Sequence, residues 1–145
     1  MEQNNMWMRF LVLGAFSLFF VGFSCKHKGF ERDGEYVYIN STNHAISFFT
    51  PHFNSFSLLG RETHVIQLHL PAGKTIGPET FVTPFNNNNT LILQFDGNKC
   101  LTMTNTSENS ILNMYHYTAE KISSRAYKFT YTFTEADYNR ATACP

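Results

Sequence analysis

The sequence has no excess of charge of either sign and no apolar run long enough to suggest a typical transmembrane helix. Its 11 basic and 11 acidic residues cancel at pH 7, so no overall field attracts nucleic acid or another anionic polymer. Its main apolar run, residues 10–23, is 14 residues long, whereas a helix that crosses a bilayer needs about 20. We therefore expect no nucleic-acid partner, and the apolar run needs another explanation.

The sequence also lacks the common catalytic and metal-binding motifs. It contains no Gly-x-Ser-x-Gly, no His-Glu-x-x-His and no paired Cys-x-x-Cys, which are typical of hydrolases and zinc sites. Six histidines are scattered along the chain. His64 and His69 fall on opposite faces of a strand, because side chains alternate. The acidic residues offer no recognisable pair for glycoside hydrolysis. We expect no metal, no cofactor and no catalytic residue.

The apolar run at residues 10–23 is typical of the central part of a secretory signal peptide. It follows Arg9 and ends at Ser24 and Cys25, in the stretch VGFSC. This stretch resembles a bacterial lipobox, whose cysteine receives diacylglycerol and becomes the acylated N-terminal residue after cleavage. We predict a lipoprotein signal peptide over 1–24, lipid attachment at Cys25 and a tether over 25–34. Ordinary cleavage or an uncleaved anchor is the alternative.

The other two cysteines are Cys100 and Cys144. If Cys25 carries lipid, they form an even pair, and a disulfide between them is one interpretation in an oxidising compartment. The alternative is one buried thiol in a strand and one free thiol near the C-terminus. Asp-Gly at 96–97 predicts a hairpin. A two- or four-residue loop would place Cys100 on the buried face with Leu91, Leu93 and Phe95.

Residues 35–145 are predicted to form a single all-β domain. The segment is rich in tyrosine, phenylalanine, threonine and asparagine, and aromatic and β-branched residues favour strands. Residues 125–134 alternate most clearly, with apolar aromatic residues on one face. We predict a two-sheet antiparallel β-sandwich, immunoglobulin- or transthyretin-like, of seven to nine strands. Thr134 and Asp137 have the spacing of a capping box, which predicts a short C-terminal helix of about two turns over 135–143.

The C-terminal stretch YTFTEADYNRA, behind a lipobox and an LPAG segment, resembles small lipoproteins of unknown function from gut Bacteroidota. The residues that match their C-terminal pattern are Tyr131, Phe133, Thr134, Glu135, Asp137 and Tyr138. This resemblance implies a lipid anchor and a β-rich body but no activity. Lys26 stands where enteric lipoproteins of the inner membrane carry aspartate, and that difference favours the outer membrane.

These observations together favour a non-catalytic, lipid-anchored protein of the cell envelope, acting as a binding or accessory module. Its partner would be an envelope protein or a glycan, and Phe53 and Phe56 in a loop are the candidate contact residues. One alternative is an envelope hydrolase whose site is assembled from distant residues. Another is a secreted soluble β protein. In a eukaryotic host the Asn-x-Ser/Thr triplets at 40, 88 and 105 would then be glycan acceptors.

Overall fold

The computed structural model describes residues 31–49, 56–73 and 75–145. The predicted signal peptide, Cys25 and Phe53 lie outside the described residues. The strands are β1 (Glu31–Asn40), β2 (Ile46–Phe49), β3 (Ser57–Leu58), β4 (Thr63–Pro71), β5 (Thr90–Phe95), β6 (Lys99–Thr104), β7 (Thr118–Lys121), β8 (Ala126–Phe133) and β9 (Thr142–Ala143). Two 3₁₀ turns, η2 (Pro78–Thr80) and η3 (Met114–His116), and the helix α2 (Glu135–Arg140) complete the described elements.

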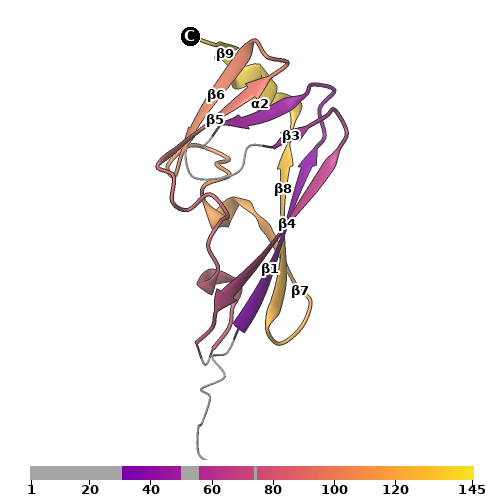
Figure 1. Ribbon diagram of the computed structural model, residues 1–145. Helices are drawn as coiled ribbons and strands as arrows, with labels where there is room; N and C mark the ends of the chain where they lie inside the picture. The colour runs from indigo at the N-terminus through magenta and orange to yellow at the C-terminus, as the bar shows by residue number, and fades with distance from the viewer. Residues whose placement is uncertain (1–30, 50–55, 74) are drawn as a thin grey trace, which may run out of the picture.

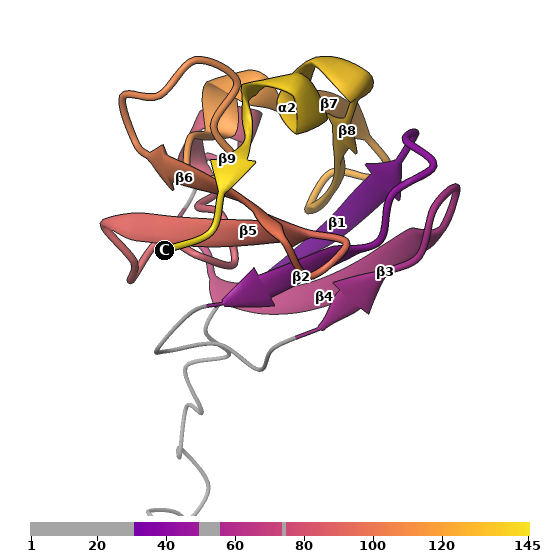
Figure 2. The same cartoon turned by 90° about the horizontal axis from the view of Figure 1, so that it is seen from above.

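The strands form two facing sheets, which confirms the predicted all-β sandwich (Figures 1 and 2). Sheet A has the order β4-β1-β8-β7, and sheet B has the order β3-β2-β5-β6-β9. One pair departs from the predicted antiparallel arrangement, because β1 and β8 run parallel, from Asp33 opposite Ala126 to Asn40 opposite Phe133. Parallel neighbours require a long connection, and here the chain forms four of the five strands of sheet B, namely β2, β3, β5 and β6, between β1 and β8.

The core is formed by alternate residues of the longest strands, as the sequence predicts. In β8 the side chains of Tyr127, Phe129, Tyr131 and Phe133 are buried, while the residues between them are partly or fully exposed. Strand β4 alternates in the same way and places His64 and His69 on opposite faces. Sheet B contributes aliphatic and aromatic residues from its inner face, among them Ile46, Phe48, Leu91, Leu93, Phe95 and Met103. This burial of large apolar side chains is the main source of stability.

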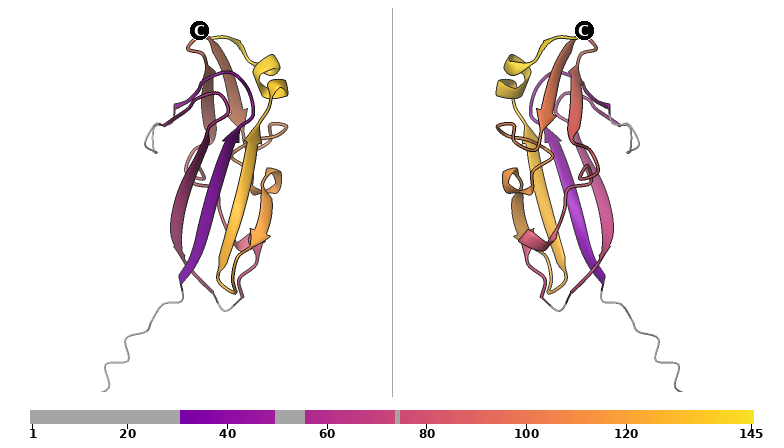
Figure 3. Two further views of the ribbon diagram at one scale, coloured as in Figure 1. Left: turned by 90° about the vertical axis from the view of Figure 1, so that its right-hand side faces the viewer. Right: turned by 90° about the vertical axis from the view of Figure 1, so that its left-hand side faces the viewer.

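Buried tyrosine hydroxyls attach two long connections to the inner face of sheet A. Tyr36 donates to the main-chain carbonyl of Val82, and Tyr131 donates to that of Asn109. Burial raises the pKa of both phenols, so each stays protonated and acts as a donor. The connections 75–89 and 105–117 therefore cover the part of sheet A that extends beyond sheet B (Figure 3).

Strand β1 begins at Glu31, which pairs with Pro71 of β4. Residues 31–34 are thus part of the sheet, although the sequence analysis assigned them to the tether. Their pairing with β4 compensates for the backbone entropy that an ordered segment loses. The start of β1 and the C-terminus lie at opposite ends of the long axis of the sandwich (Figure 3).

The hairpin between β5 and β6 differs from the predicted one in its loop length. Phe95 pairs with Lys99, which leaves a three-residue loop whose first two residues, Asp96 and Gly97, have positive φ. Glycine adopts this conformation without steric cost. An odd loop length moves Cys100 opposite Gln94, to the face away from the core, so the expected burial of Cys100 with Leu93 is wrong.

On that outer face Cys100 forms a disulfide with Cys144, which joins β6 to the residue that follows β9. Helix α2 ends at Arg140, earlier than predicted, because Thr142 and Ala143 leave the helix to pair with β6. Its start agrees with the capping-box prediction. The Asp137 carboxylate accepts hydrogen bonds from the main-chain N–H of Thr134 at 2.8 Å and from its hydroxyl at 3.2 Å.

Candidate functional site

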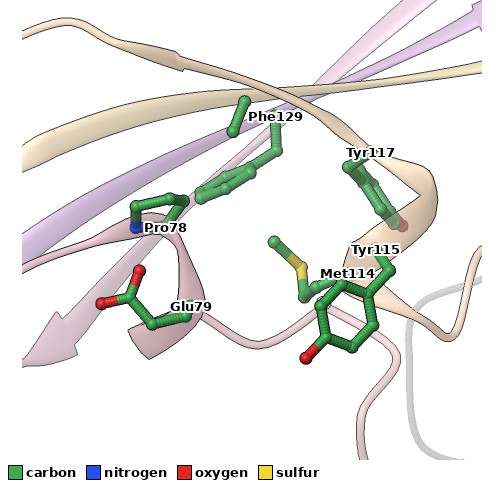
Figure 4. A pocket seen from close by; sticks show the side chains of 7 residues that line it. Pro78, Glu79, Met114, Tyr115, Tyr117 and Phe129 are labelled. Atoms are coloured by element: carbon green, nitrogen blue, oxygen red, sulfur yellow. The ribbon is translucent and has the colours of Figure 1, made fainter.

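A pocket of about 340 Å³ opens at the side of the sandwich, between the inner face of β7 and β8 and the turns η2 and η3 (Figure 4). We call it the side pocket. Its lining residues are Pro78, Glu79, Met114, Tyr115, Tyr117, Ala119 and Phe129. Pockets that bind small molecules have similar volumes, about 300 to 1,000 Å³, and are mostly apolar with few polar groups. The side pocket is at the small end of this range.

One wall of the side pocket is the turn η2. Proline at position 78 has a fixed φ that suits the first residue of a helical turn, and the Thr80 hydroxyl donates to the Gly77 carbonyl at 2.7 Å. The Glu79 carboxylate lies directly against the Cα of Gly77, where any Cβ would collide with it. Glycine at position 77 thus leaves room for the Glu79 carboxylate to fold back against the main chain of its own turn.

The opposite wall is the turn η3, which separates two neighbouring side chains. Asn113 caps the turn, because its side chain accepts a hydrogen bond from the Tyr115 main-chain N–H at 3.0 Å. The side chain of Met114 points into the side pocket, and the ring of Tyr115 lies at its mouth (Figure 4). Tyr115 is 93% exposed, so its ring is accessible to a ligand.

The floor of the side pocket is formed by Phe129 of β8, by Ala119 and by the ring of Tyr117. Ala119 is opposite Phe129 in the sheet, and its small side chain leaves the space above the ring open. The Tyr117 hydroxyl donates to the Ile111 carbonyl at 2.7 Å and lies 3.3 Å from the Tyr38 hydroxyl. Burial raises the pKa of Tyr117, so this hydroxyl is a neutral donor that is already used within the core.

Glu79 carries the one charge among the residues that line the side pocket. A carboxylate is an acceptor only, and the Tyr115 hydroxyl is the other polar side-chain group at the mouth. None of the lining residues is a serine, cysteine, histidine or lysine, the usual nucleophiles and bases. The mostly apolar lining is suited to binding an apolar group.

A second cluster surrounds His44 at the end of the sandwich that carries α2. The ring of His44 stacks on Tyr138 with centroids 3.5 Å apart, and its Nδ1 hydrogen-bonds the Asp96 carboxylate at 2.5 Å. Its Nε2 lies 3.8 Å from the Glu135 carboxylate, and Lys99 Nζ is 4.0 Å from the centre of the Tyr138 ring. We call these five residues the His44 cluster.

The His44 cluster ties three segments together, namely the β1–β2 loop, the β5–β6 hairpin and α2. Asp96 also accepts from the main-chain N–H of Ala45 at 2.9 Å, and these hydrogen bonds lower the pKa of Asp96, with the bond from His44 as the largest cause. The two carboxylates contact different nitrogens of one ring instead of converging on one point. Within the described ranges, no group of three or more histidine, cysteine or acidic side chains could hold a metal ion.

Phe56, a predicted contact residue, and the tyrosines of β1 have structural roles. Phe56 is half-buried and stacks on Phe48, with centroids 4.1 Å apart, and on His64 at 4.2 Å, so it packs against the core rather than presenting a free aromatic surface. Tyr36 and Tyr38 are fully buried. Phe53 lies outside the described residues, and Cys25 does as well.

Two of the three candidate glycan acceptors are also structural. Asn40 and Asn88 are buried, and Asn40 donates to the main-chain carbonyls of His44 and Leu59. Asn105 is exposed. A buried amide nitrogen that is already hydrogen-bonded is not accessible to a glycosylating enzyme in the folded protein.

Sequence analysis did not find Glu79 and Met114 as site residues. They are 35 positions apart in the chain, and each lies in a short 3₁₀ turn inside a long connection. The Gly-Pro at 77–78 is typical of a break between strands and carries no signal for a site. No local pattern indicates that these two connections meet over β7 and β8.

The described part of the chain contains no helix of the length and apolar character needed to cross a bilayer. Comparison of the sequence with models of protein families and with curated proteins, and of the structure with solved structures, found no match. The interpretation of this protein therefore depends on its own residues and their geometry.

Proposed function

We propose that this protein is a non-catalytic binding module that is held at the bacterial cell envelope by a lipid on Cys25. The side pocket is the observation that carries the binding role. It combines an apolar floor of Phe129 and Ala119 with one carboxylate and one exposed ring at its mouth, which is the composition expected of a ligand site.

The anchor is proposed from the sequence, where the apolar run at 10–23 ends at VGFSC. Each methylene that enters the bilayer contributes about 0.8 kcal/mol, and one chain alone holds a protein only marginally. Three acyl chains on a single residue would hold it stably. Residues 26–30 would connect the lipid to β1, and the outer membrane is the location that we propose.

The binding role supports a proposed partner in the envelope, either a protein or a glycan. The envelope-hydrolase alternative would use His44 and Asp96, which share a hydrogen bond. Yet the free ring nitrogen of His44 faces the Glu135 carboxylate, whereas a nucleophilic mechanism needs a hydroxyl or thiol there. The binding module is therefore the function that we favour.

The anchor is tested by the intact mass of the mature protein from its native membrane. We expect a mass that corresponds to a chain beginning at Cys25 with three added acyl chains, and loss of the lipid in Cys25→Ala. Wild-type protein that is unmodified at Cys25 and is released without detergent would contradict the anchor.

The binding role is tested by incubating the full chain, in a non-ionic detergent, with an extract of the native envelope. Ala119→Phe is the matched variant, because it fills the side pocket with a side chain at an exposed strand position. We expect a component that the wild type retains and Ala119→Phe loses. Equal retention by both proteins, or no retention by either, would contradict a binding role for the side pocket.

A further inference from the structure

We propose that the ligand of the side pocket is an apolar organic cation, a quaternary or alkyl-substituted ammonium group. This inference depends on the proposed function in one respect, namely that the side pocket binds a ligand. It adds the chemical class of that ligand, which follows from the charge and the ring faces of the lining residues.

The walls of the side pocket are of the kind that attract cations. Tyr115, Tyr117 and Phe129 contribute aromatic rings, whose faces carry partial negative charge. Met114 adds a polarisable thioether that adapts to the shape of a ligand. Methyl groups on nitrogen make the same apolar contacts with these walls as carbon methyl groups do, and they carry part of the positive charge.

The carboxylate of Glu79 favours a ligand that carries a positive charge. Among the lining residues it has no cationic counterpart, and the exposed Lys121, two residues along β7 from Ala119, does not line the side pocket. An anionic ligand would be repelled by Glu79. A neutral ligand with several acceptors would find few donors, because the Tyr117 hydroxyl already donates to Ile111.

The volume of the side pocket sets the size of the ligand. About 340 Å³ accommodates one small head group, whereas a sugar chain needs an extended groove. The 93% exposure of Tyr115 leaves its ring able to cover a bound group from the solvent side. A methylated ammonium on a short chain fits these limits, whether it is a free metabolite or the end of a larger molecule.

The test compares choline with its neutral carbon isostere, 3,3-dimethyl-1-butanol. The two probes have nearly the same shape and differ in charge. Binding is followed by NMR of the full chain in a choline-free, non-ionic detergent, with ¹³C-labelled methionine methyl groups. Met114 lines the side pocket, and Met103 is buried in the core and serves as an internal control. Assignments come from Met103→Leu and Met114→Leu.

We expect choline to shift the Met114 signal and not the Met103 signal, and to bind at least about fivefold more tightly than the isostere, the ratio that one partly exposed cation–π and ion-pair contact provides. Glu79→Gln and Tyr115→Ala should each weaken choline binding about fivefold. Tyr115→Phe keeps the ring and should bind like the wild type. Glu108→Gln removes an exposed carboxylate that does not line the side pocket and is the charge control.

Three results would overturn this proposal. Equal affinity for choline and the isostere would show that the side pocket selects its ligand by shape and not by charge. The cation proposal would then fail, whereas the proposed binding role would stand. An equal loss in Glu79→Gln and Glu108→Gln would show attraction by overall charge alone. A Met114 signal that moves with neither probe would exclude this ligand class, and retention of an envelope component that Ala119→Phe loses would still support the binding role.

Discussion

Asn40 is the last residue of β1, and its side chain organises the loops at one end of the sandwich. It is fully buried. Its Nδ2 donates to the His44 carbonyl at 2.7 Å and to the Leu59 carbonyl at 2.9 Å. Its Oδ1 accepts from the Thr42 hydroxyl at 2.7 Å and from the Thr42 main-chain N–H at 3.1 Å. Both polar atoms of the amide are thus used in folding.

Replacement of Asn40 by alanine removes these four hydrogen bonds. A typical intramolecular hydrogen bond contributes about 0.5–1.5 kcal/mol, and a buried group left without a partner costs about 1–3 kcal/mol. The Leu59 carbonyl keeps a partner in the Glu62 main-chain N–H at 3.1 Å, whereas the buried Thr42 N–H loses the acceptor described here. We therefore expect Asn40→Ala to lower the free energy of unfolding by about 3 to 4 kcal/mol.

The measurement is urea unfolding of the full chain, followed by far-UV circular dichroism, because the single tryptophan, Trp7, lies outside the described residues. Asn105→Ala is the matched control. Asn105 belongs to another Asn-x-Ser/Thr triplet and is exposed, so its loss should change stability by less than about 0.5 kcal/mol. If Asn40→Ala and Asn105→Ala differed by less than about 1 kcal/mol, the role assigned to the buried amide would be refuted.

Three further predictions concern other parts of the fold. The double variant Cys100→Ser/Cys144→Ser opens a loop with a sequence separation of 44, for which chain entropy gives an upper value of about 4 kcal/mol; urea unfolding should show a loss of about 2–4 kcal/mol. The hydrogen bond with His44 lowers the pKa of Asp96 below its ordinary value of 3.8. The stability from this bond is therefore present above pH 3.8 and disappears as the pH falls through the lower pKa of the folded state. Thermal unfolding between about pH 5 and pH 2 should therefore show a shallower acid dependence in Asp96→Asn than in the wild type. Tyr131→Phe keeps the ring but loses a hydrogen bond to a loop carbonyl and should cost about 1 kcal/mol in urea.

Each of these outcomes has a clear opposite. An unchanged unfolding midpoint without the disulfide would refute the chain-entropy contribution assigned to it. An equally steep acid dependence in Asp96→Asn would mean that other carboxylates dominate. The hydroxyl of Tyr115 is exposed, so Tyr115→Phe is the control for Tyr131→Phe. If both variants lost the same free energy of unfolding, the stabilising role of the Tyr131 hydrogen bond would be refuted.

Local features of the chain were predictable wherever the cause lies within a few residues. The alternation in β8 follows from the two-residue repeat of a strand, and each aromatic residue between Tyr127 and Phe133 is buried as that repeat requires. The start of α2 follows from Thr134 and Asp137, which contact each other directly. These interactions do not depend on how distant segments are arranged.

Features that depend on distant segments were predicted wrongly or not at all. The predicted face of Cys100 depended on one residue of loop length, since a shift of one position exchanges the two faces of a strand. The parallel pairing of β1 with β8 joins residues more than 90 positions apart, and nothing in either strand alone specifies the direction of its neighbour. Asn40, part of a glycosylation triplet in the sequence, became a buried core group.

The sequence by itself determined the class of the fold, the inward face of β8 and the start of the capped helix, because hydrophobic periodicity and capping act over short distances. Only the tertiary structure decided the side pocket and the His44 cluster. In the side pocket, Glu79 and Met114 come together because the hydroxyls of Tyr36 and Tyr131 attach two separate connections to one sheet. That arrangement results from the packing of the whole core, and no short segment of the chain encodes it.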